Sequence, residues 1–196
     1  MSFKSWTKAH IMHVDWPFDI YNTPMIKTHA LISCLMLILF IPTATGNISE
    51  TRTLSFYHTH TAETLEVTYY ENGRYLLEPM EQLRDFLADW RNGHEHEIDP
   101  VLMDILWDIQ RVSGHKGTYE VISSYRSPET NQYLRSKSTG VAKNSQHVLG
   151  KAIDVRLRGL DTAELRDTAL ELQRGGVGYY QKSDFVHVDT GRVRRW

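Results

Sequence analysis

The sequence has little cysteine and no excess of charge of either sign. Cys34 is the single cysteine among 196 residues, which excludes an intramolecular disulfide and a metal site built from several thiolates. Lys and Arg total 22 against 24 Asp and Glu, a formal net charge of -2, so we expect no nucleic-acid partner. Any metal must therefore be held by histidine and carboxylate, and the 10 histidines are the residues to follow.

Proline and glycine are also sparse, with 6 and 12 residues. Hydrophobic residues make up 41% and charged residues 23%, which excludes a disordered, collagen-like or low-complexity chain. The length of 196 residues fits one domain or a small pair.

The apolar run at residues 30–41 is short for a membrane span. It reads ALISCLMLILFI, and as a helix it would be about 18 Å long, against a hydrocarbon core of about 30 Å. Lys27 precedes the run and the small residues of 43–46 follow it, which is the order of a secretory signal. We therefore expect cleavage before Asn47, with an uncleaved anchor as the alternative.

The predicted signal divides the chain into an N-terminal extension, residues 1–46, and one domain, residues 47–196. Met25 begins a compact basic segment, so translation is expected to start there. Cys34 is expected to be removed with the signal, which leaves an exported domain that folds without disulfides.

Residues 47–196 are predicted to form one α+β domain, with an antiparallel sheet flanked by helices. Strands are expected where apolar residues alternate between turn signals; they are 52–57, 64–70, 74–77, 119–123, 152–157, 177–180 and 185–189. Helices are expected from apolar spacing and capping residues; they are 79–90, 100–114, 128–137 and 161–173. Residues 138–150 are predicted to form a long loop.

Two predicted strands place polar side chains opposite apolar ones. In residues 152–157 the larger apolar side chains share one face, so Asp154 faces the other way. In residues 185–189 the valines share one face and His187 takes the opposite one. If these strands are neighbours, His147, Asp154 and His187 can converge. Two imidazoles and a carboxylate, with a fourth position open to water, are the ligand set of a catalytic zinc site.

Each of these residues also has an ordinary structural interpretation. A single histidine on a strand, such as His187, is more often hydrogen-bonded than a metal ligand. Asp154 can instead pair with Arg156 or Arg158, and a surface pair of that kind contributes about 0 to 1 kcal/mol. The spacing alone therefore leaves both interpretations open.

The motifs from residue 123 onward resemble those of zinc peptidases that act on D-alanyl peptides of bacterial cell walls. The matching segments are SSYRS at 123–127, Ser-x-His followed by six residues and Asp at 145–154, and acid-x-x-His at 184–187. More closely, residues 54–196 resemble the YcbK (MepK-type) murein endopeptidases, through SSYRSPETN, GVAKNSQHVLGKAIDVRL, RGGVGYY and FVHVDTGRVRRW in that order. The resemblance implies a hedgehog or D-Ala-D-Ala-peptidase-like fold.

The resemblance also implies one zinc ion per chain, bound by three side chains. They are His147, Asp154 and His187. A structural zinc site usually has four protein ligands, so three ligands favour an enzyme over a binding module with a structural metal.

Two charged residues are implied to act in the reaction. Asp184 would be the general base, since it precedes a ligand by three residues on the turn that enters the ligand's strand; its alternative is a turn residue that caps neighbouring amides. Arg126 would bind the oxyanion or a substrate carboxylate. The alternative for Arg126 is a structural salt bridge with Glu129 or another acid.

Four further residues are candidates for substrate contact or for support of the ligands. Ser145, Tyr125 and Gln146 are candidate contacts near the motifs. Asp189 shares a face with His187 in the predicted strand and is expected to orient an imidazole.

Other motifs carry weaker signals. His58 with His60, and His94 with His96, have the spacing of a chelate, but the second pair is expected in a solvated loop. Tyr179-Tyr180 either lines a substrate groove or packs against the sheet. The C-terminal arginines are expected to form a solubilising tail, with binding of anionic wall polymers as the alternative; they are Arg192, Arg194 and Arg195.

The resemblance thus implies a periplasmic zinc endopeptidase that cuts peptidoglycan cross-links at meso-diaminopimelate, including 3-3 links. A zinc D,D- or L,D-carboxypeptidase and a non-catalytic peptidoglycan-binding module are the alternatives. The apolar run is not preceded by Arg-Arg, so the general secretory route is expected. After signal cleavage no stable membrane span is expected, and the sequence leaves the oligomeric state open.

Overall fold

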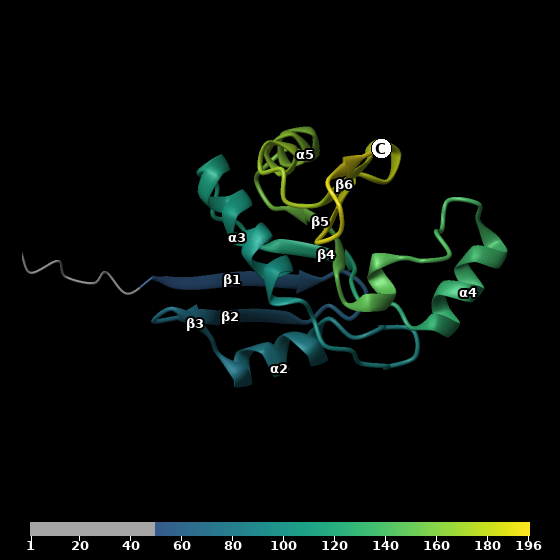
Figure 1. Ribbon diagram of the computed structural model, residues 1–196, viewed down its shortest axis with the longest axis horizontal. Helices are drawn as coiled ribbons and strands as arrows, with labels where there is room; N and C mark the ends of the chain where they lie inside the picture. Colours follow the sequence, from purple (N-terminus) through teal and green to yellow (C-terminus); the bar gives the residue numbers. More distant parts are fainter. Residues whose placement is uncertain (1–49) are drawn as a thin grey trace, which may run out of the picture. The chain divides into compact units, whose positions relative to one another are not determined.

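One sheet of eight strands, in the order β3-β2-β1-β4-β5-β7-β6-β8, organises the fold (Figure 1). The computed structural model describes residues 50–196, so the predicted signal and its cleavage point lie outside the described residues. The strands are β1 (Thr51–His58), β2 (Thr64–Glu71), β3 (Arg74–Tyr75), β4 (Tyr119–Ser123), β5 (Ala152–Leu157), β6 (Gly176–Tyr180), β7 (Phe185–Asp189) and β8 (Arg194–Arg195). The helices are α2 (Leu77–Phe86), α3 (Pro100–Ser113), α4 (Pro128–Lys137) and α5 (Thr162–Glu171), with short 3-10 turns η1 (Gln146–Leu149) and η2 (Gln181–Ser183).

The predicted α+β class is confirmed, but the sheet is mixed and not wholly antiparallel. Strands β1 and β4 pair in parallel, as do β6 and β8. Two hairpin strands and two helices separate β1 from β4 along the chain, which gives the long crossover that a parallel pair requires. The two-residue strand β8 was not predicted, because a pair of arginines carries no strand pattern.

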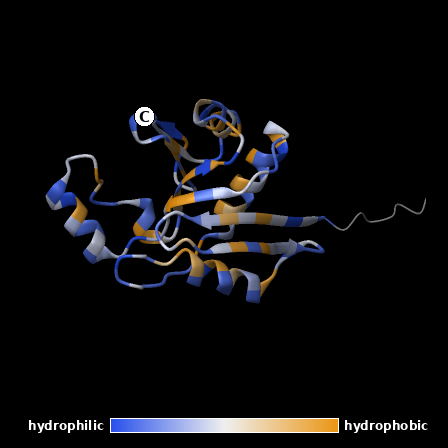
Figure 2. Cartoon of the chain, turned by 180° about the vertical axis from the view of Figure 1, so that it is seen from behind, coloured by the Kyte–Doolittle hydropathy of each residue, from blue (hydrophilic) through white to orange (hydrophobic). Residues whose placement is uncertain are grey.

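The apolar face of the sheet and helices α2, α3 and α5 form one hydrophobic core. Figure 2 shows polar and apolar residues alternating along the strands, as a half-buried sheet requires. Leu54 and Phe56 of β1 and Val155 of β5 lie in this core, together with Leu106 of α3 and Leu165 of α5. The opposite face of β5 and β7 is therefore free to carry polar residues.

Helix α3 begins and ends where its capping residues predict. The side chain of Asp99 accepts a hydrogen bond from the amide of Val101, and Pro100 follows at the first helical position. A cap of this kind stabilises a helix by about 1 kcal/mol. Gly114 ends the helix in the left-handed conformation, with φ of 69°.

Helix α2 is shorter than the predicted helix over 79–90 and begins earlier, at Leu77. Its end is set by contacts with a distant segment. The carbonyl oxygen of Leu87 accepts a hydrogen bond from the amide of Tyr125, at 3.2 Å, and so leaves the helical ladder. Trp90 consequently lies outside the helix, where its ring stacks on that of His60 with centroids 3.9 Å apart.

The order of the central strands brings distant motifs together. Strand β5 lies between β4 and β7 in the sheet, so the segments after residue 119, after residue 152 and before residue 189 are neighbours. Helix α4 projects away from the sheet beside the end of β4 (Figure 1). In residues 50–196, we find no helix with the length and apolar character needed to span a bilayer.

Candidate metal centre

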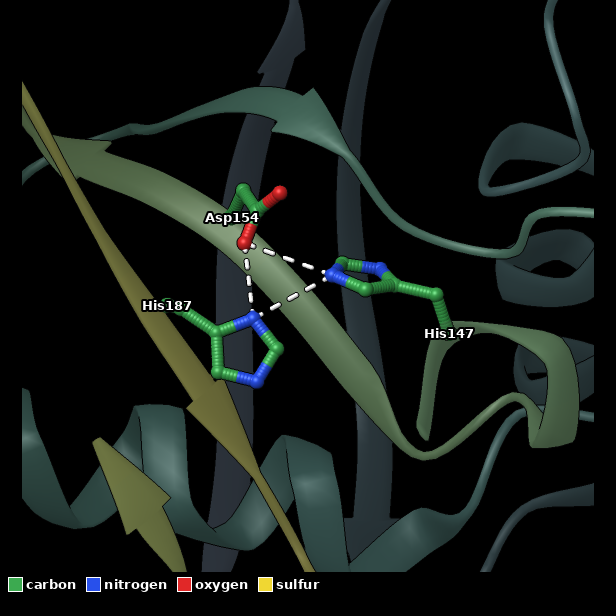
Figure 3. A group of neighbouring side chains, drawn as sticks. All are labelled: His147, Asp154 and His187. Atoms are coloured by element: carbon green, nitrogen blue, oxygen red, sulfur yellow. Dashed lines mark hydrogen bonds and ion pairs between the residues drawn. The ribbon is translucent and has the colours of Figure 1, made fainter. Parts of the chain in front are cut away.

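His147, Asp154 and His187 point at one another from three different elements (Figure 3). Asp154 on β5 pairs directly with His187 on β7, and η1 brings His147 to the same point. One ligand atom from each residue lies within 4.8 Å of the other two, and all three side chains are buried. Among the described residues this is the one group of three or more potential ligands.

The turn that carries His147 is held by its own flanking residues. The hydroxyl of Ser145 accepts a hydrogen bond from the amide of His147, at 3.3 Å, and so caps η1. Gly150 ends the turn with φ of 64°, and a Cβ at that position would collide with the carbonyl oxygen of Glu97. The predicted loop over 138–150 therefore contains one ordered turn at the point where a ligand is needed.

Hydrogen bonds outside the group fix the tautomer of each imidazole. Nδ1 of His147 lies 2.7 Å from the carbonyl oxygen of Ser124, which can only accept, so Nδ1 carries the proton. Nε2 of His187 lies 2.9 Å from Oδ2 of Asp189 and donates to that carboxylate. This leaves Nε2 of His147 and Nδ1 of His187, the two nitrogens available to a metal ion, facing Oδ1 of Asp154.

The spacing of these three acceptor atoms fits a tetrahedral metal ion. Oδ1 of Asp154 is 2.8 Å from Nδ1 of His187 and 3.4 Å from Nε2 of His147, and the two nitrogens are 3.2 Å apart. Ligand atoms at about 2.0 to 2.1 Å from a tetrahedral zinc ion are about 3.3 Å from each other. Three lone pairs at this separation repel one another unless a proton or a metal ion lies between them.

The three titratable groups influence one another strongly. Burial alone would raise the pKa of Asp154, but the adjacent His147 and His187 imidazoles outweigh burial and lower it. Burial lowers the pKa of His147, which favours the neutral imidazole that a metal requires. Burial acts in the same direction on His187, but the carboxylates of Asp154 and Asp189 outweigh it and raise the pKa of His187.

The group opens into a cleft of about 460 Å³. Its lining includes residues of the loop over 138–146 and the aromatic residues Tyr180, Phe185 and Trp196. Arg126 also lines the cleft. Of the described residues that line it, Asp154 is the one carboxylate.

The side chain of Arg126 makes few hydrogen bonds with the protein. Its Nη1 is 3.4 Å from Oδ1 of Asn131, and its buried Nε has no hydrogen-bond partner among the described residues. Burial lowers the pKa of Arg126, and the nearby charge of Asp154 acts against this. The predicted alternative, a salt bridge with Glu129, is absent from the described residues, where Glu129 lies 3.9 Å from His94 instead.

The structure brings most of the other candidates to this site. Ser145 and Gln146 line the cleft, and Asp189 contacts His187 directly. Tyr125 is buried outside the cleft lining, and its ring stacks on that of His96 at 5.1 Å.

Asp184, like Tyr125, lies outside the cleft lining. Its Oδ1 accepts a hydrogen bond from the hydroxyl of Thr162 at 2.7 Å, and its Oδ2 is 3.4 Å from Nε of Arg156. The side chain is 64% exposed, and Asp184 does not contribute to the cleft lining. Its left-handed backbone, with φ of 52°, ends η2 before β7 begins.

Sequence reasoning missed several residues that support the site. The carbonyl of Ser124 has no sequence signal, because its role depends on the path of the backbone after β4. Arg194, expected in a solubilising tail, binds Asp189, and Trp196 forms part of the cleft wall. Tyr180 lines the cleft, as one interpretation of the Tyr179-Tyr180 pair expected.

In the other two histidine pairs, His58 and His96 make hydrogen bonds with residues near them in the chain. Nδ1 of His58 accepts from the amides of His60 and Thr61, both at 3.3 Å, and so stabilises the turn after β1. Nδ1 of His96 lies 2.8 Å from the carbonyl oxygen of Glu97. Neither pair belongs to a group of three potential ligands in the part of the chain that the structure describes.

The mixed α+β sheet and its buried His-Asp-His group define a protein with a three-ligand candidate metal centre at the bottom of a cleft. Residues 46–196 match the family model described as "Peptidoglycan L,D-endopeptidase MepK", and the chain belongs to that family.

Two relatives show how far the similarity extends. The "Peptidoglycan L,D-endopeptidase MepK" of Escherichia coli (strain K12) is 39% identical over 153 residues, which cover 78% of this chain and 84% of the relative. The "Probable peptidoglycan L,D-endopeptidase MepK" of Haemophilus influenzae is 40% identical over 146 residues, covering 74% of this chain and 78% of the relative. The search of solved structures found no match.

Proposed function

We propose that this chain is a zinc endopeptidase that hydrolyses peptide cross-links of peptidoglycan, including 3-3 links between two meso-diaminopimelate residues. The observation that carries the proposal is the convergence of three metal-ligand atoms at the bottom of the cleft. Membership of a family whose relatives are named L,D-endopeptidases supports the substrate class.

The ion would be held by Nε2 of His147, Oδ1 of Asp154 and Nδ1 of His187, since these are the ligand atoms that face one another. A bound zinc ion supplies Lewis acidity, which polarises a carbonyl and lowers the pKa of a water to about 7. Ser124 and Asp189 keep the two imidazoles in the required tautomers by accepting their outer N–H groups. The ligands are therefore arranged before the metal binds.

Arg126 would bind the negatively charged oxygen that develops on the scissile carbonyl. Its guanidinium lines the cleft near Asp154 and forms no ion pair with a carboxylate among the described residues. Because Nε is buried, the terminal guanidinium nitrogens are the donors that would reach a substrate in the cleft, where exclusion of water strengthens a hydrogen bond.

The lining of the cleft suits a peptide. It combines residues of the loop over 138–146, the aromatic residues Tyr180, Phe185 and Trp196, and the ligand group. The hydroxyl of Tyr180 accepts a hydrogen bond from Nε1 of Trp196, at 3.0 Å, so the two rings support each other. A stem peptide in the cleft would pack its alkyl groups on these aromatic residues.

The proposed activity is tested with the purified full chain and cross-linked muropeptide dimers. We expect about one zinc ion per chain by elemental analysis and conversion of dimers to monomers by chromatography. His147→Ala should lose both zinc and activity, whereas His94→Ala, which changes an exposed histidine, should retain both.

Two results of the same experiment would replace the proposal. Release of a terminal D-alanine from monomers while dimers stay whole would identify a carboxypeptidase. Zinc binding without cleavage of any wall fragment would identify a peptidoglycan-binding module with a structural metal.

We also propose export to the periplasm, because the proposed substrate lies outside the cytoplasmic membrane. The basic, apolar and small segments around residues 27–46 support export by the general secretory route. A fusion of residues 1–60 to a reporter that is active only after export tests this proposal. Replacing Leu37, within the apolar run, by Arg is the control, and we expect it to abolish reporter activity.

A further inference from the structure

Asp189 is the centre of a buried hydrogen-bond network behind His187. Its Oδ2 accepts from Nε2 of His187 at 2.9 Å. Its Oδ1 accepts from the amides of Gly176 and Gly191, at 3.1 and 2.8 Å. The side chain of Asp189 is fully buried, so its charge requires compensation within the protein.

Arg194 provides that compensation through both guanidinium nitrogens. Nη1 lies 2.9 Å from Oδ1 of Asp189, and Nη2 lies 2.6 Å from Oδ2. This is the bidentate geometry that fixes the plane of a carboxylate as well as its position. Arg194 therefore holds Oδ2 toward His187 together with the two amides that bind Oδ1.

The C-terminal segment delivers Arg194 to this position. Strand β8 pairs in parallel with β6, which places Arg194 beside Gly176. A Cβ on Gly176 would lie 2.5 Å from Oδ2 of Asp189, so the close approach of these groups requires glycine. The amide of Trp196 donates to the carbonyl of Val177 at 3.3 Å and holds the end of the segment.

We infer that Arg194 is a positioning residue for the metal centre, acting through Asp189 to hold the His187 ring with Nδ1 toward Asp154. The inference rests on the proposed metal centre and assigns the C-terminal segment a role in building it. Groups that orient metal-binding histidines typically change metal affinity about 10- to 100-fold when they are removed. Arg194 contacts Asp189 and not the ligand His187 itself, so we expect its removal to change zinc affinity by the lower part of that range.

Arg194 also lines the cleft, which gives it a competing role. A guanidinium in the cleft can bind a carboxylate of the substrate directly. Direct binding would change KM without changing the affinity for zinc, because the substrate is absent when zinc is titrated. Positioning through Asp189 would change zinc affinity in the protein alone.

The deciding measurement is the Kd of zinc for the metal-free full chain, obtained by competition with a chelator of known affinity. Arg194→Ala is expected to weaken binding about 10-fold. Arg195→Ala is the matched control, since Arg195 is an exposed neighbour on the same strand with no ion pair among the described residues, and its Kd should equal that of the wild type. The double variant Asp189→Asn/Arg194→Ala should bind no more weakly than Asp189→Asn, because Arg194 acts through Asp189.

A second readout follows the imidazole itself. In the metal-free protein, at a pH where the His187 ring is neutral, ¹⁵N NMR shifts distinguish the tautomer protonated at Nε2 from the one protonated at Nδ1, and we expect Arg194→Ala to lower the fraction of the Nε2 tautomer. Thermal unfolding checks that each variant is folded. If Arg194→Ala does not fold, Arg194→Lys decides, since lysine retains the charge and loses the bidentate geometry; weaker zinc binding is then expected.

The possible failures are distinguishable. A wild-type Kd in Arg194→Ala, or losses that add fully in the double variant, would overturn the inference, as would an increase in KM with unchanged Kd. Failure of the wild-type chain to bind zinc would instead overturn the proposed function.

Discussion

Asp154 and His187 are directly opposite each other on the antiparallel strands β5 and β7, with Oδ1 and Nδ1 2.8 Å apart. The register of two strands thus sets the distance between two ligand atoms. A slip of one residue would move one of these side chains to the apolar face of the sheet. The hydrophobic core that fixes the register therefore also fixes the candidate metal centre.

Replacing Asp154 tests whether the group binds a metal. Asp154→Ala removes one of three ligand atoms and the negative charge between the imidazoles, so zinc content should fall from one ion per chain to well below one. Elemental analysis after gel filtration measures this change. Asp167→Asn, which alters an exposed aspartate paired with Arg166, should retain the ion.

Local sequence signals predicted most strands and the limits of α3. The caps Asp99 and Ser127 lie directly before their helices, and alternation placed Asp154 and His187 on a polar face. These features depend on residues close together in the chain. The convergence of the three ligands was predictable only if β5 and β7 were neighbours, as the structure now shows.

Features that depend on distant contacts could not be predicted in this way. Helix α2 ends where Leu87 bonds to Tyr125, thirty-eight positions away in the chain. Arg194 reaches Asp189 only because β8 adds to the edge of the sheet beside β6. The direction of the Asp184 side chain depends on Thr162 of α5, which no motif contains.

Arg126→Ala tests the proposed binding of the oxyanion. Loss of one such donor typically lowers kcat about 100-fold or more, and zinc content should stay unchanged because Arg126 is not a ligand. Steady-state cleavage of muropeptide dimers gives kcat and KM separately. Arg135→Ala, on the projecting helix α4, serves as the control and should leave kcat near the wild-type value. An effect on KM alone would instead indicate binding of a substrate carboxylate.

Asp184→Asn tests two roles for this residue: the general base that the acid-x-x-His motif implies, and the turn-stabilising residue that its contacts indicate. A general base contributes about 100- to 10,000-fold to the rate. The asparagine side chain of Asp184→Asn cannot act as a base, so that contribution would be lost. Because the Asp184 carboxylate is exposed and bonded to Thr162, we propose that it holds the turn before β7, and we expect kcat to change less than about threefold. A loss of 100-fold with normal zinc content would restore the role of base to Asp184.

The pH dependence of stability should reveal the buried carboxylate of Asp89. Oδ2 of Asp89 accepts from the amide of Ser127 at 2.9 Å, and Oδ1 accepts from the amide of Arg91 at 3.2 Å. Burial alone would raise the pKa of Asp89, but hydrogen bonds from Thr130, Ser127 and Arg91 outweigh it and lower the pKa. The unfolded chain consequently binds the proton more readily than the folded chain does.

This difference stabilises the fold above the ordinary aspartate pKa of about 4 and is lost as the pH falls through the lower folded value. Asp89→Asn should reduce the free energy of unfolding at pH 7 by about 1.5 to 3 kcal/mol, the range for hydrogen bonds to a charged group. It should also flatten the decline in stability below about pH 4, since the asparagine does not titrate. Urea unfolding from pH 7 to pH 3 measures both effects. Asp85→Asn, which changes an exposed aspartate, is the control. If the free energy of unfolding of Asp89→Asn fell as steeply below about pH 4 as that of the wild type, other carboxylates would be the cause of the decline.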